Sequence, residues 1–414
     1  MRINGEIKPP ADKSISHRAF ILGALAKGRT SVFSSLESED VKSTREALKA
    51  LGVRISKSND SYIIEGGNLT EPETLIDAGN SGTTARLLSG VLSGIKGVSI
   101  ITGDSSLIKR PMARVIKPLR LMGGDFMARQ DRFMPMAIRG TDLKGITYDM
   151  DVASAQVKSA IILAGLKAEG VTSVTEPSLS RDHTERMLAF FGVRLKISGR
   201  NISLEGPQEL TARDITVPGD PSSSAFPSVL AAATPGSELR VMGICLNPAR
   251  TAFLNVLKRM GADITIENIK ASAGETVGDF IIKGSRLKGT VIEGDEIPGL
   301  IDEIPILAVA ASLAEGRTIV RNAQELRVKE ADRITSMVEG FASLGSHIKE
   351  LEDGFVIDGP LKLRNGSVKT YSDHRIAMAF YILSMAADID VQLDNNSCVD
   401  ISYPNFFKDM KQLI

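Results

Sequence analysis

A sequence repeat of about 70 residues occurs six times along the 414-residue chain, and this repeat constrains the fold more than any other feature. Each copy opens with helix-capping residues and an apolar segment of helical length, and continues into a β-prone run. A second, amphipathic segment then ends in an apolar residue followed by glycine. Two helices and several strands per copy predict an α/β module rather than a helical array. The opening segment of each repeat, from the capping residues to the β-prone run, spans 12–30, 80–98, 154–172, 220–239, 302–318 and 372–390.

The six modules divide into two groups of three. Pro218-Gly219-Asp220-Pro221, near the midpoint, has the turn chemistry of a crossover, and Pro9-Pro10 is a second stiff joint. We therefore expect a first lobe over 12–219 and a second lobe made of 1–11 and 220–414, with the N-terminal strand in the second lobe. Two crossovers would form a hinge, and we expect a ligand cleft between the lobes.

Composition excludes several classes of protein. Lys and Arg number 50, as do Asp and Glu, so no global field attracts nucleic acid or an anionic membrane. The first residues lack the apolar core of a signal peptide, and no apolar run reaches membrane-spanning length. The two cysteines, Cys245 and Cys398, provide no disulfide framework, which fits the cytoplasm. The four histidines match no metal-ligand spacing, so we expect no metal and no cofactor.

The first module opens with residues suited to an anion. Asp12, Ser14 and Ser16 are candidate N-caps before the apolar run 19–26, and Gly28 is a candidate helix stop. Backbone N–H groups at such a helix start, with two nearby cations from Lys13 and Arg18, suit phosphate or carboxylate. A capped surface helix with two solvated charges is the alternative interpretation.

The other modules repeat this combination of caps and cations. Taken singly, each has an ordinary explanation: a tight turn at 79–83, a surface loop at 104–112, a capped helix start at 181–185 with Glu185 in its first turn, and helix-dipole carboxylates at 302–303. Together they gather cations, with few carboxylates beyond Asp302, Glu330 and Asp373, which predicts a small, multiply anionic ligand. The cations are Lys13, Arg18, Arg86, Arg110, Arg181, Lys329, Arg333 and Arg375.

The segment Arg327–Arg333 is the densest charge cluster. A solvated helix face is the simplest interpretation, with Glu330 and Arg333 three residues apart. On such a face the like charges of Lys329 and Arg333, four residues apart, are unfavourable unless an anion lies between them.

At these residues the chain resembles the 5-enolpyruvylshikimate-3-phosphate synthase family of enolpyruvyl transferases. The resemblance covers the whole length and implies two lobes, each of three βαβαββ repeats, arranged as an inside-out α/β barrel with a cleft between the lobes. It implies transfer of the enolpyruvyl group of phosphoenolpyruvate to the 5-hydroxyl of shikimate 3-phosphate, in aromatic amino acid biosynthesis. The motifs that carry it are Asp12–Arg18, Gly79–Thr83, Lys109–Met112, Ser154-Ala155-Gln156, Arg327–Arg333 and Asp373–Arg375.

The resemblance also implies roles for individual residues. Asp302 would be the base for the 5-hydroxyl, Glu330 the acid that protonates the methylene carbon, and Lys13 a catalytic cation. Shikimate 3-phosphate would be bound by Lys13, Ser14, Arg18, Ser154, Ala155, Gln156, Arg181, Asp302 and Lys329. Phosphoenolpyruvate would be bound by Lys13, Gly82, Arg110, Gln156, Arg333 and Arg375.

Three positions depart from the family pattern. Ile401 stands where many members have a lysine that contacts phosphoenolpyruvate, and Glu325 where some have an asparagine that touches the shikimate ring. Ala155 replaces a serine, so only its backbone can contribute. Residues 154–159 resemble the class that is often less sensitive to glyphosate, whereas Gly82 resembles the other class, so inhibitor sensitivity stays open.

Three alternatives remain. The sister transferase acting on UDP-N-acetylglucosamine uses a cysteine general acid in the loop that corresponds to Gly103–Met112, and no cysteine occurs there. A non-catalytic phosphometabolite-binding protein would keep the cations without Asp302 and Glu330. A repeat scaffold for protein partners would expose apolar patches. We expect an enzyme that acts as a monomer on small anionic substrates.

Overall fold

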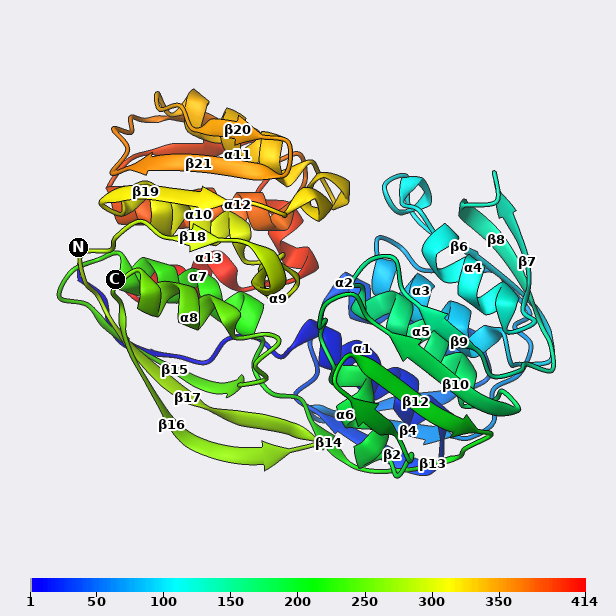
Figure 1. The fold of residues 1–414 in the computed structure, drawn as a ribbon. Coiled ribbons are helices and arrows are strands. Elements are labelled where there is room, and N and C mark those ends of the chain that lie inside the picture. The colour runs from blue at the N-terminus through cyan, green and yellow to red at the C-terminus, as the bar shows by residue number, and fades with distance from the viewer. Residues whose placement is uncertain (1) are drawn as a thin grey trace. The chain divides into compact units, whose positions relative to one another are not determined.

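The computed structural model describes residues 2–414, and helices alternate with short strands throughout (Figure 1). The chain forms two compact units. Unit 1 contains the residues up to Pro10, together with Pro218–Lys270 and Thr276–Ile414. Unit 2 contains Ala11–Val217 and the five residues Ala271–Glu275.

Unit 2 contains three sheets that share one strand arrangement. In each, a short strand pairs in parallel with a central strand, and the central strand pairs antiparallel with the inner strand of a hairpin. The first sheet has the order β13(Leu210–Thr211), β2(Ala26–Phe33), β4(Ser61–Gly66), β3(Arg54–Ser58), and β14(Ile215–Thr216) also pairs with β2. The others are β5(Ile76–Asp77), β6(Gly97–Thr102), β8(Phe133–Gly140), β7(Asp125–Arg129), and β9(Thr147–Asp149), β10(Gly170–Thr175), β12(Asn201–Gly206), β11(Lys196–Ser198).

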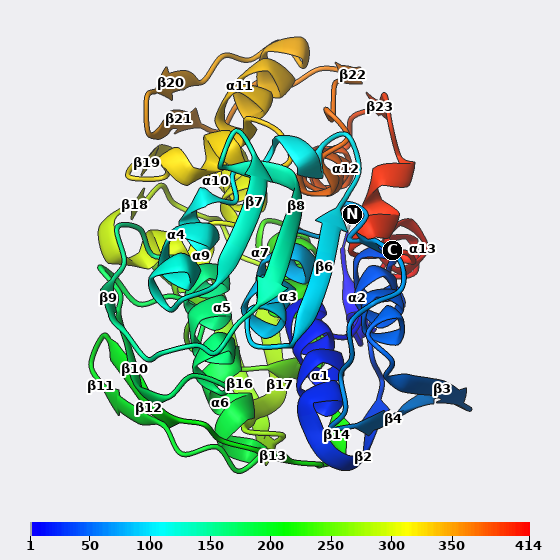
Figure 2. The same ribbon diagram turned by 90° about the vertical axis from the view of Figure 1, so that its right-hand side faces the viewer.

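The helix that precedes each central strand of unit 2 is apolar and almost wholly buried. These helices are α1(Lys13–Leu25), α3(Gly82–Leu92) and α5(Ala155–Gly165), and they lie side by side (Figure 2). A helix that is apolar on all faces is stable only when neighbours surround it. The second helices of the repeats are α2(Glu39–Ala50), α4(Ala113–Leu121), which follows the 3₁₀ turn η1(Leu107–Lys109), and α6(His183–Phe190).

Unit 1 repeats the same plan with one departure. Its first two sheets have four strands, whereas the sixth module forms only a parallel pair, β22(Gly366–Val368) and β23(Val391–Leu393). The N-terminal strand β1 pairs in parallel with β15, as expected for a strand that belongs with the C-terminal half. The four-stranded sheets are β1(Asn4–Ile7), β15(Glu238–Cys245), β17(Glu275–Lys283), β16(Asp263–Ser272), and β18(Val291–Ile292), β19(Gly316–Val320), β21(Gly354–Gly359), β20(Lys349–Leu351).

The core of unit 1 is built on α7(Pro221–Ala232), α10(Ile304–Leu313) and α12(His374–Ala387), which pack against one another (Figure 1). These are again the apolar helices that open the repeats. The remaining helices are α8(Ala252–Arg259), α9(Ile297–Leu300), α11(Arg333–Ser343) and α13(Phe406–Lys411), with 3₁₀ turns η2(Gly294–Glu296), η3(Gln324–Val328) and η4(Ser397–Ile401). The two-lobed α/β fold class expected from the repeats is confirmed. Among residues 2–414, no helix is long and apolar enough to cross a membrane.

One expected helix end is wrong. Helix α1 ends at Leu25, and strand β2 begins at once with Ala26, so Gly28 lies inside the strand instead of ending the helix. Gly28 has a φ of 112°, a conformation that glycine adopts without strain. It therefore shapes the start of the strand.

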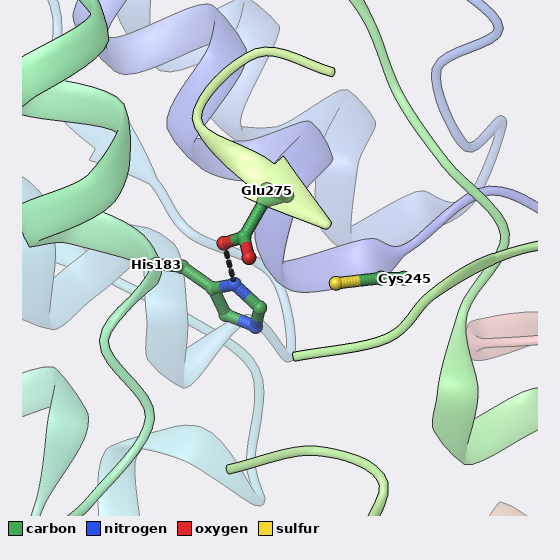
Figure 3. Close-up of side chains that lie close together, drawn as sticks. All are labelled: His183, Cys245 and Glu275. Atoms are coloured by element: carbon green, nitrogen blue, oxygen red, sulfur yellow. Dashed lines mark hydrogen bonds and ion pairs between the residues drawn. The ribbon is translucent and has the colours of Figure 1, made fainter. Parts of the chain in front are cut away.

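The five residues 271–275 of unit 2 are the tip of the β16–β17 hairpin. Their last residue, Glu275, is buried, and its Oε1 lies 2.6 Å from Nδ1 of the buried His183 at the start of α6 (Figure 3). Arg186, one turn along α6, places its Nε 3.8 Å from the other oxygen of Glu275. A buried carboxylate needs such partners, and they hold the tip against α6.

Candidate active site

The start of α1 presents Lys13 from a well-capped helix. Asp12 is the N-cap, and its Oδ1 accepts a hydrogen bond from the backbone of Ile15 at 2.8 Å. Lys13 is the first helical residue, and its Nζ lies 3.0 Å from Oδ2 of Asp40 on α2. The carboxylate fixes the position of the ammonium beside the N–H groups of the helix start.

Arg18, one turn further, joins three helices. Its Nε donates to Oγ1 of Thr184 at 2.7 Å, its Nη2 to Oγ of Ser159 at 3.0 Å, and its Nη1 to the carbonyl of Ser14 at 3.0 Å. The side chain is buried. Arg18 thus orders the N-terminal turns of α1, α5 and α6 relative to one another, in addition to the substrate contact that the sequence predicts.

The start of α3 brings together three residues predicted to bind phosphoenolpyruvate. Arg86 Nη1 donates to Oε1 of Gln156 at 2.5 Å, and Gln156 Nε2 donates to Thr83 at 3.0 Å. A Cβ on Gly82 would lie 2.8 Å from Arg86 Nη1 and 3.7 Å from Nη1 of Arg110. Gly82, Arg110 and Gln156 therefore lie around Arg86, and a side chain at position 82 would displace the end of the Arg86 guanidinium.

Arg110 itself is held from the side. Its Nη2 donates to Oδ1 of Asn80 at 2.8 Å, and Asn80 Nδ2 in turn donates to Asp104 at 2.6 Å. Both partners come from segments that the sequence interprets as turns. The loop after β6 is thus ordered around a guanidinium.

The last predicted ligands of unit 2 stand at the starts of α5 and α6. Ser154 is the N-cap of α5, with its Oγ 3.4 Å from the backbone N of Val157, and Ala155 is the first helical residue. Arg181 lies half-buried in the loop before α6. Ser14 is half-buried in the first turn of α1.

A buried cluster of charged residues lies beside these residues, and it was not predicted from the sequence. Nζ of Lys158 lies 2.8 Å from Oε2 of Glu176 and 2.6 Å from Oε1 of Glu185, and all three side chains are about 1% exposed. Burial raises the pKa of Glu185, although Lys158 opposes the shift. Glu185 lies in the first turn of α6, as predicted, and its contact with Lys158 also ties α6 to α5. The sequence feature that could have indicated this contact is Lys158, a charged residue within the otherwise apolar part of the segment 154–172.

In unit 1, Arg333 is the hub of the predicted residues. It is the first residue of α11, and its side chain is 1% exposed. Nε donates to Asp373 at 2.8 Å, Nη2 to Glu330 at 2.8 Å, and Nη1 to Asp302 at 3.2 Å. Burial alone would lower the pKa of Arg333, but the three carboxylates outweigh it and raise that pKa, so the guanidinium stays charged.

Arg375 lies next to this hub, in the first turn of α12. Its Nη1 donates to the backbone carbonyl of Asp302 at 3.1 Å, and its Nη2 lies 3.9 Å from Oδ2 of Asp302. Asp373 caps α12 by accepting from the backbone N of Arg375 at 2.8 Å. The structure therefore brings Asp302, Glu330, Arg333 and Arg375 into one cluster.

The segment Arg327–Arg333 is not a helix face, so that interpretation is wrong. The 3₁₀ turn η3 ends at Val328, Lys329 and Glu330 lie half-buried in the connection, and α11 begins only at Arg333. Asp332 caps α11, accepting from the backbone N of Ile334 and of Thr335, each at 3.1 Å. The charged residues of this segment are therefore positioned by the turn that leads into α11, and not by spacing along one helix face.

Two of the positions that depart from the family pattern, Ile401 and Glu325, lie in 3₁₀ turns of unit 1. Ile401 ends η4 with a half-buried, apolar side chain that cannot bind an anion, and Glu325 lies half-buried within η3.

The two units thus contribute different kinds of functional group. Unit 2 supplies cations at helix N-termini, a combination suited to phosphate and carboxylate groups. Unit 1 supplies two carboxylates, Asp302 and Glu330, on one buried guanidinium, and carboxylates are among the groups that serve as general acids and bases.

Comparison with known proteins gives one consistent result. The family model described as EPSP synthase (3-phosphoshikimate 1-carboxyvinyltransferase) matches residues 1–410. Proteins named 3-phosphoshikimate 1-carboxyvinyltransferase from Desulforamulus reducens and Bacillus cereus are 48% and 47% identical; the matches cover 100% and 99% of this chain and 97% of each relative.

Solved structures agree. An EPSP synthase from Acinetobacter baumannii superposes with a TM-score of 0.89 at 43% identity, over 100% of this chain and 96% of that one. The enolpyruvyl transferase NikO from Streptomyces tendae, at 17% identity, a TM-score of 0.75 and coverage of 100% and 95%, shares the fold. The chain belongs to the EPSP synthase family, the 3-phosphoshikimate 1-carboxyvinyltransferases.

Proposed function

We propose that this chain transfers the enolpyruvyl group of phosphoenolpyruvate to the 5-hydroxyl of shikimate 3-phosphate and releases phosphate, as a step of aromatic amino acid biosynthesis. The family match over residues 1–410 supports the reaction class. The observation that carries the chemistry is that Asp302 and Glu330 share the buried guanidinium of Arg333.

Substrate binding is assigned from the predicted residues. Shikimate 3-phosphate is bound by Lys13, Ser14, Arg18, Ser154, Ala155, Gln156, Arg181, Asp302 and Lys329. Phosphoenolpyruvate is bound by Lys13, Gly82, Arg110, Gln156, Arg333 and Arg375. The convergence of Gly82, Arg110 and Gln156, and of Arg333 with Arg375, supports this division.

The reaction proceeds by addition and then elimination. In the addition, Asp302 takes the proton of the 5-hydroxyl, the oxygen bonds to C2 of phosphoenolpyruvate, and Glu330 protonates the methylene carbon. In the elimination, Glu330 removes a proton from the new methyl group, the double bond forms again, and phosphate leaves C2 with the proton that Asp302 took from the hydroxyl, so both carboxylates return to their starting states. Lys13 and the arginines stabilise the anionic groups throughout.

Both units supply residues to this set, so turnover requires them to act on one pair of substrates. We assign residues 12–219 as one lobe of the enzyme and residues 1–11 with 220–414 as the other. A cytoplasmic monomer is part of the proposal, and Cys245 and Cys398, which are buried and not joined in a disulfide, fit a reducing compartment.

A phosphate-release assay tests the function. The purified chain is incubated with phosphoenolpyruvate alone, with added shikimate 3-phosphate, and with added UDP-N-acetylglucosamine. We expect release only with shikimate 3-phosphate, together with a product heavier by the carboxyvinyl group. Release with the UDP-sugar alone would assign the chain to the sister reaction, and no release with either acceptor would overturn the proposal.

A further inference from the structure

Glu303 is a buried carboxylate next to the proposed base, and the proposed mechanism does not use it. It is 1% exposed and immediately precedes α10, whose side chains are almost all apolar. Its Oε1 accepts a hydrogen bond from the hydroxyl of Ser222, and Nη1 of Arg375 lies 3.6 Å from the same oxygen. A carboxylate in such surroundings is stable only if cations and donors compensate it.

Ser222 is itself fixed by a second buried cation. Nη2 of Arg250 donates to Oγ of Ser222 at 2.9 Å and to Oδ1 of Asp220 at 2.8 Å, and its side chain is 1% exposed. Asp220 is the N-cap of α7. A continuous set of polar contacts therefore runs from the start of α7, through Arg250, Ser222 and Glu303, to the guanidinium of Arg375.

Arg375 receives its remaining support from the neighbouring residue. The carbonyl of Asp302 accepts from Nη1 at 3.1 Å, so residues 302 and 303 both hold the same nitrogen. The position of Nη1 thus depends on the loop before α10 and on the charge of Glu303. Small displacements of a cation that must face an anion weaken binding strongly.

We infer that Glu303 is a positioning residue that orients Arg375 to bind phosphoenolpyruvate. This inference rests on the proposed function, in which Arg375 is a phosphoenolpyruvate ligand. Glu303 touches neither substrate in this assignment, and it acts through the guanidinium. Neutralising it loosens Arg375 and weakens binding of one substrate, while the residues that hold shikimate 3-phosphate stay in place.

The first measurement is steady-state kinetics of Glu303→Gln, which keeps the size of the side chain and removes its charge. We expect the KM for phosphoenolpyruvate to rise roughly tenfold, the effect of weakening one charged contact with the substrate, with the KM for shikimate 3-phosphate changed less than about twofold. A residue that only stabilises the fold would lower the concentration of active enzyme and leave both KM values unchanged.

Two serine variants on α7 provide a matched pair. Ser222→Ala removes the donor to Glu303, and we expect a smaller rise in the same KM. Ser228→Ala removes an equally buried hydroxyl, which donates to the carbonyl of Ser224 within the same helix at 2.7 Å, and we expect no change. If Glu303→Gln fails to fold, this pair still decides the inference: equal KM values in both serine variants would overturn it.

A double-mutant cycle separates positioning from direct contact. In an Arg375→Lys background, Glu303→Gln should have little further effect on the KM for phosphoenolpyruvate, because its route of action is already lost. A full, additive effect in that background would overturn the inference, as would an unchanged KM in Glu303→Gln itself. Absence of turnover in the wild-type chain would overturn the proposed function and with it the inference, whereas normal wild-type turnover with an unchanged variant would overturn the inference alone.

Discussion

The ammonium of Lys13 lies 3.0 Å from the carboxylate of Asp40, and the two side chains are only 20% and 11% exposed. A lysine at the start of a helix is ordinarily solvated and mobile. Here α2 holds it in place, so that the cation is already oriented before any ligand arrives.

Replacing Lys13 by methionine is expected to abolish most turnover. The methionine side chain is unbranched and only one atom shorter, but it lacks the charge proposed to stabilise both anionic substrates, which corresponds to a decrease of about 100-fold or more in kcat/KM. The assay is phosphate release with both substrates, beside thermal unfolding to show that the fold persists. Near-normal kcat in the folded variant would contradict the assigned role.

Glu330→Gln should lower kcat sharply with little change in either KM. The amide can still accept a hydrogen bond from Arg333 but can neither deliver nor accept the proton, and general acid–base catalysis contributes about 100- to 10,000-fold. Glu339→Gln on α11 is the control, because its carboxylate bonds to Tyr371 at the surface. Equal kcat values for the two variants would remove Glu330 from the mechanism.

His17 makes unfolding depend on pH below neutrality. Its ring is buried, Nδ1 lies 2.6 Å from Oγ1 of Thr44, and burial, reinforced by the nearby charges of Lys13 and Arg18, lowers its pKa well below the ordinary value. Below about pH 6.5 the unfolded chain binds a proton at His17 that the folded chain does not bind. Each pH unit of acidification therefore lowers the free energy of unfolding by about 1.4 kcal/mol.

We therefore expect His17→Gln to show a flatter decline of the unfolding midpoint than wild type between pH 6.5 and 5, whatever its midpoint at pH 7.5. His347→Gln, at an exposed histidine, should follow the wild-type curve. Parallel curves for all three proteins would show that His17 does not cause the decline.

Gly90→Ala is expected to destabilise the contact between α3 and α5. A Cβ on Gly90 would lie 2.1 Å from the backbone carbonyl oxygen of Ala160, and a backbone atom cannot move aside as a side chain can. Overpacking of this kind costs about 1–3 kcal/mol or more, which exceeds the gain in helix propensity of about 1 kcal/mol. Gly5→Ala is the control, since no atom lies within 4 Å of its added Cβ. Urea midpoints measure the difference, and a midpoint for Gly90→Ala at or above that of Gly5→Ala would contradict the packing.

Local patterns predicted the helices that open the modules with little error. The opening segments 80–98 and 154–172 contain α3 and α5 as predicted, because a long apolar segment behind a capping serine has few other stable conformations. Gly28 and the segment 327–333 were misjudged for one reason: helix ends depend on what the next strand or loop pairs with. That information lies outside the local sequence.

The buried charges could not be predicted in the same way. Lys158, Glu176 and Glu185 are each ordinary surface residues by type, and only their mutual contact makes burial tolerable. The same holds for Glu303, whose partners Ser222 and Arg375 lie far away in the chain.

By itself, the sequence determined the repeat, the apolar helices and the residue types at their N-termini, since periodicity and capping are properties of neighbouring residues. Tertiary structure alone decided that Asp302, Glu330 and Asp373 share one guanidinium and that Gly82 lies against Arg86 and Arg110. Electrostatic interactions act through space over a few ångströms, and the distances that set them exist only once separate repeats have packed together.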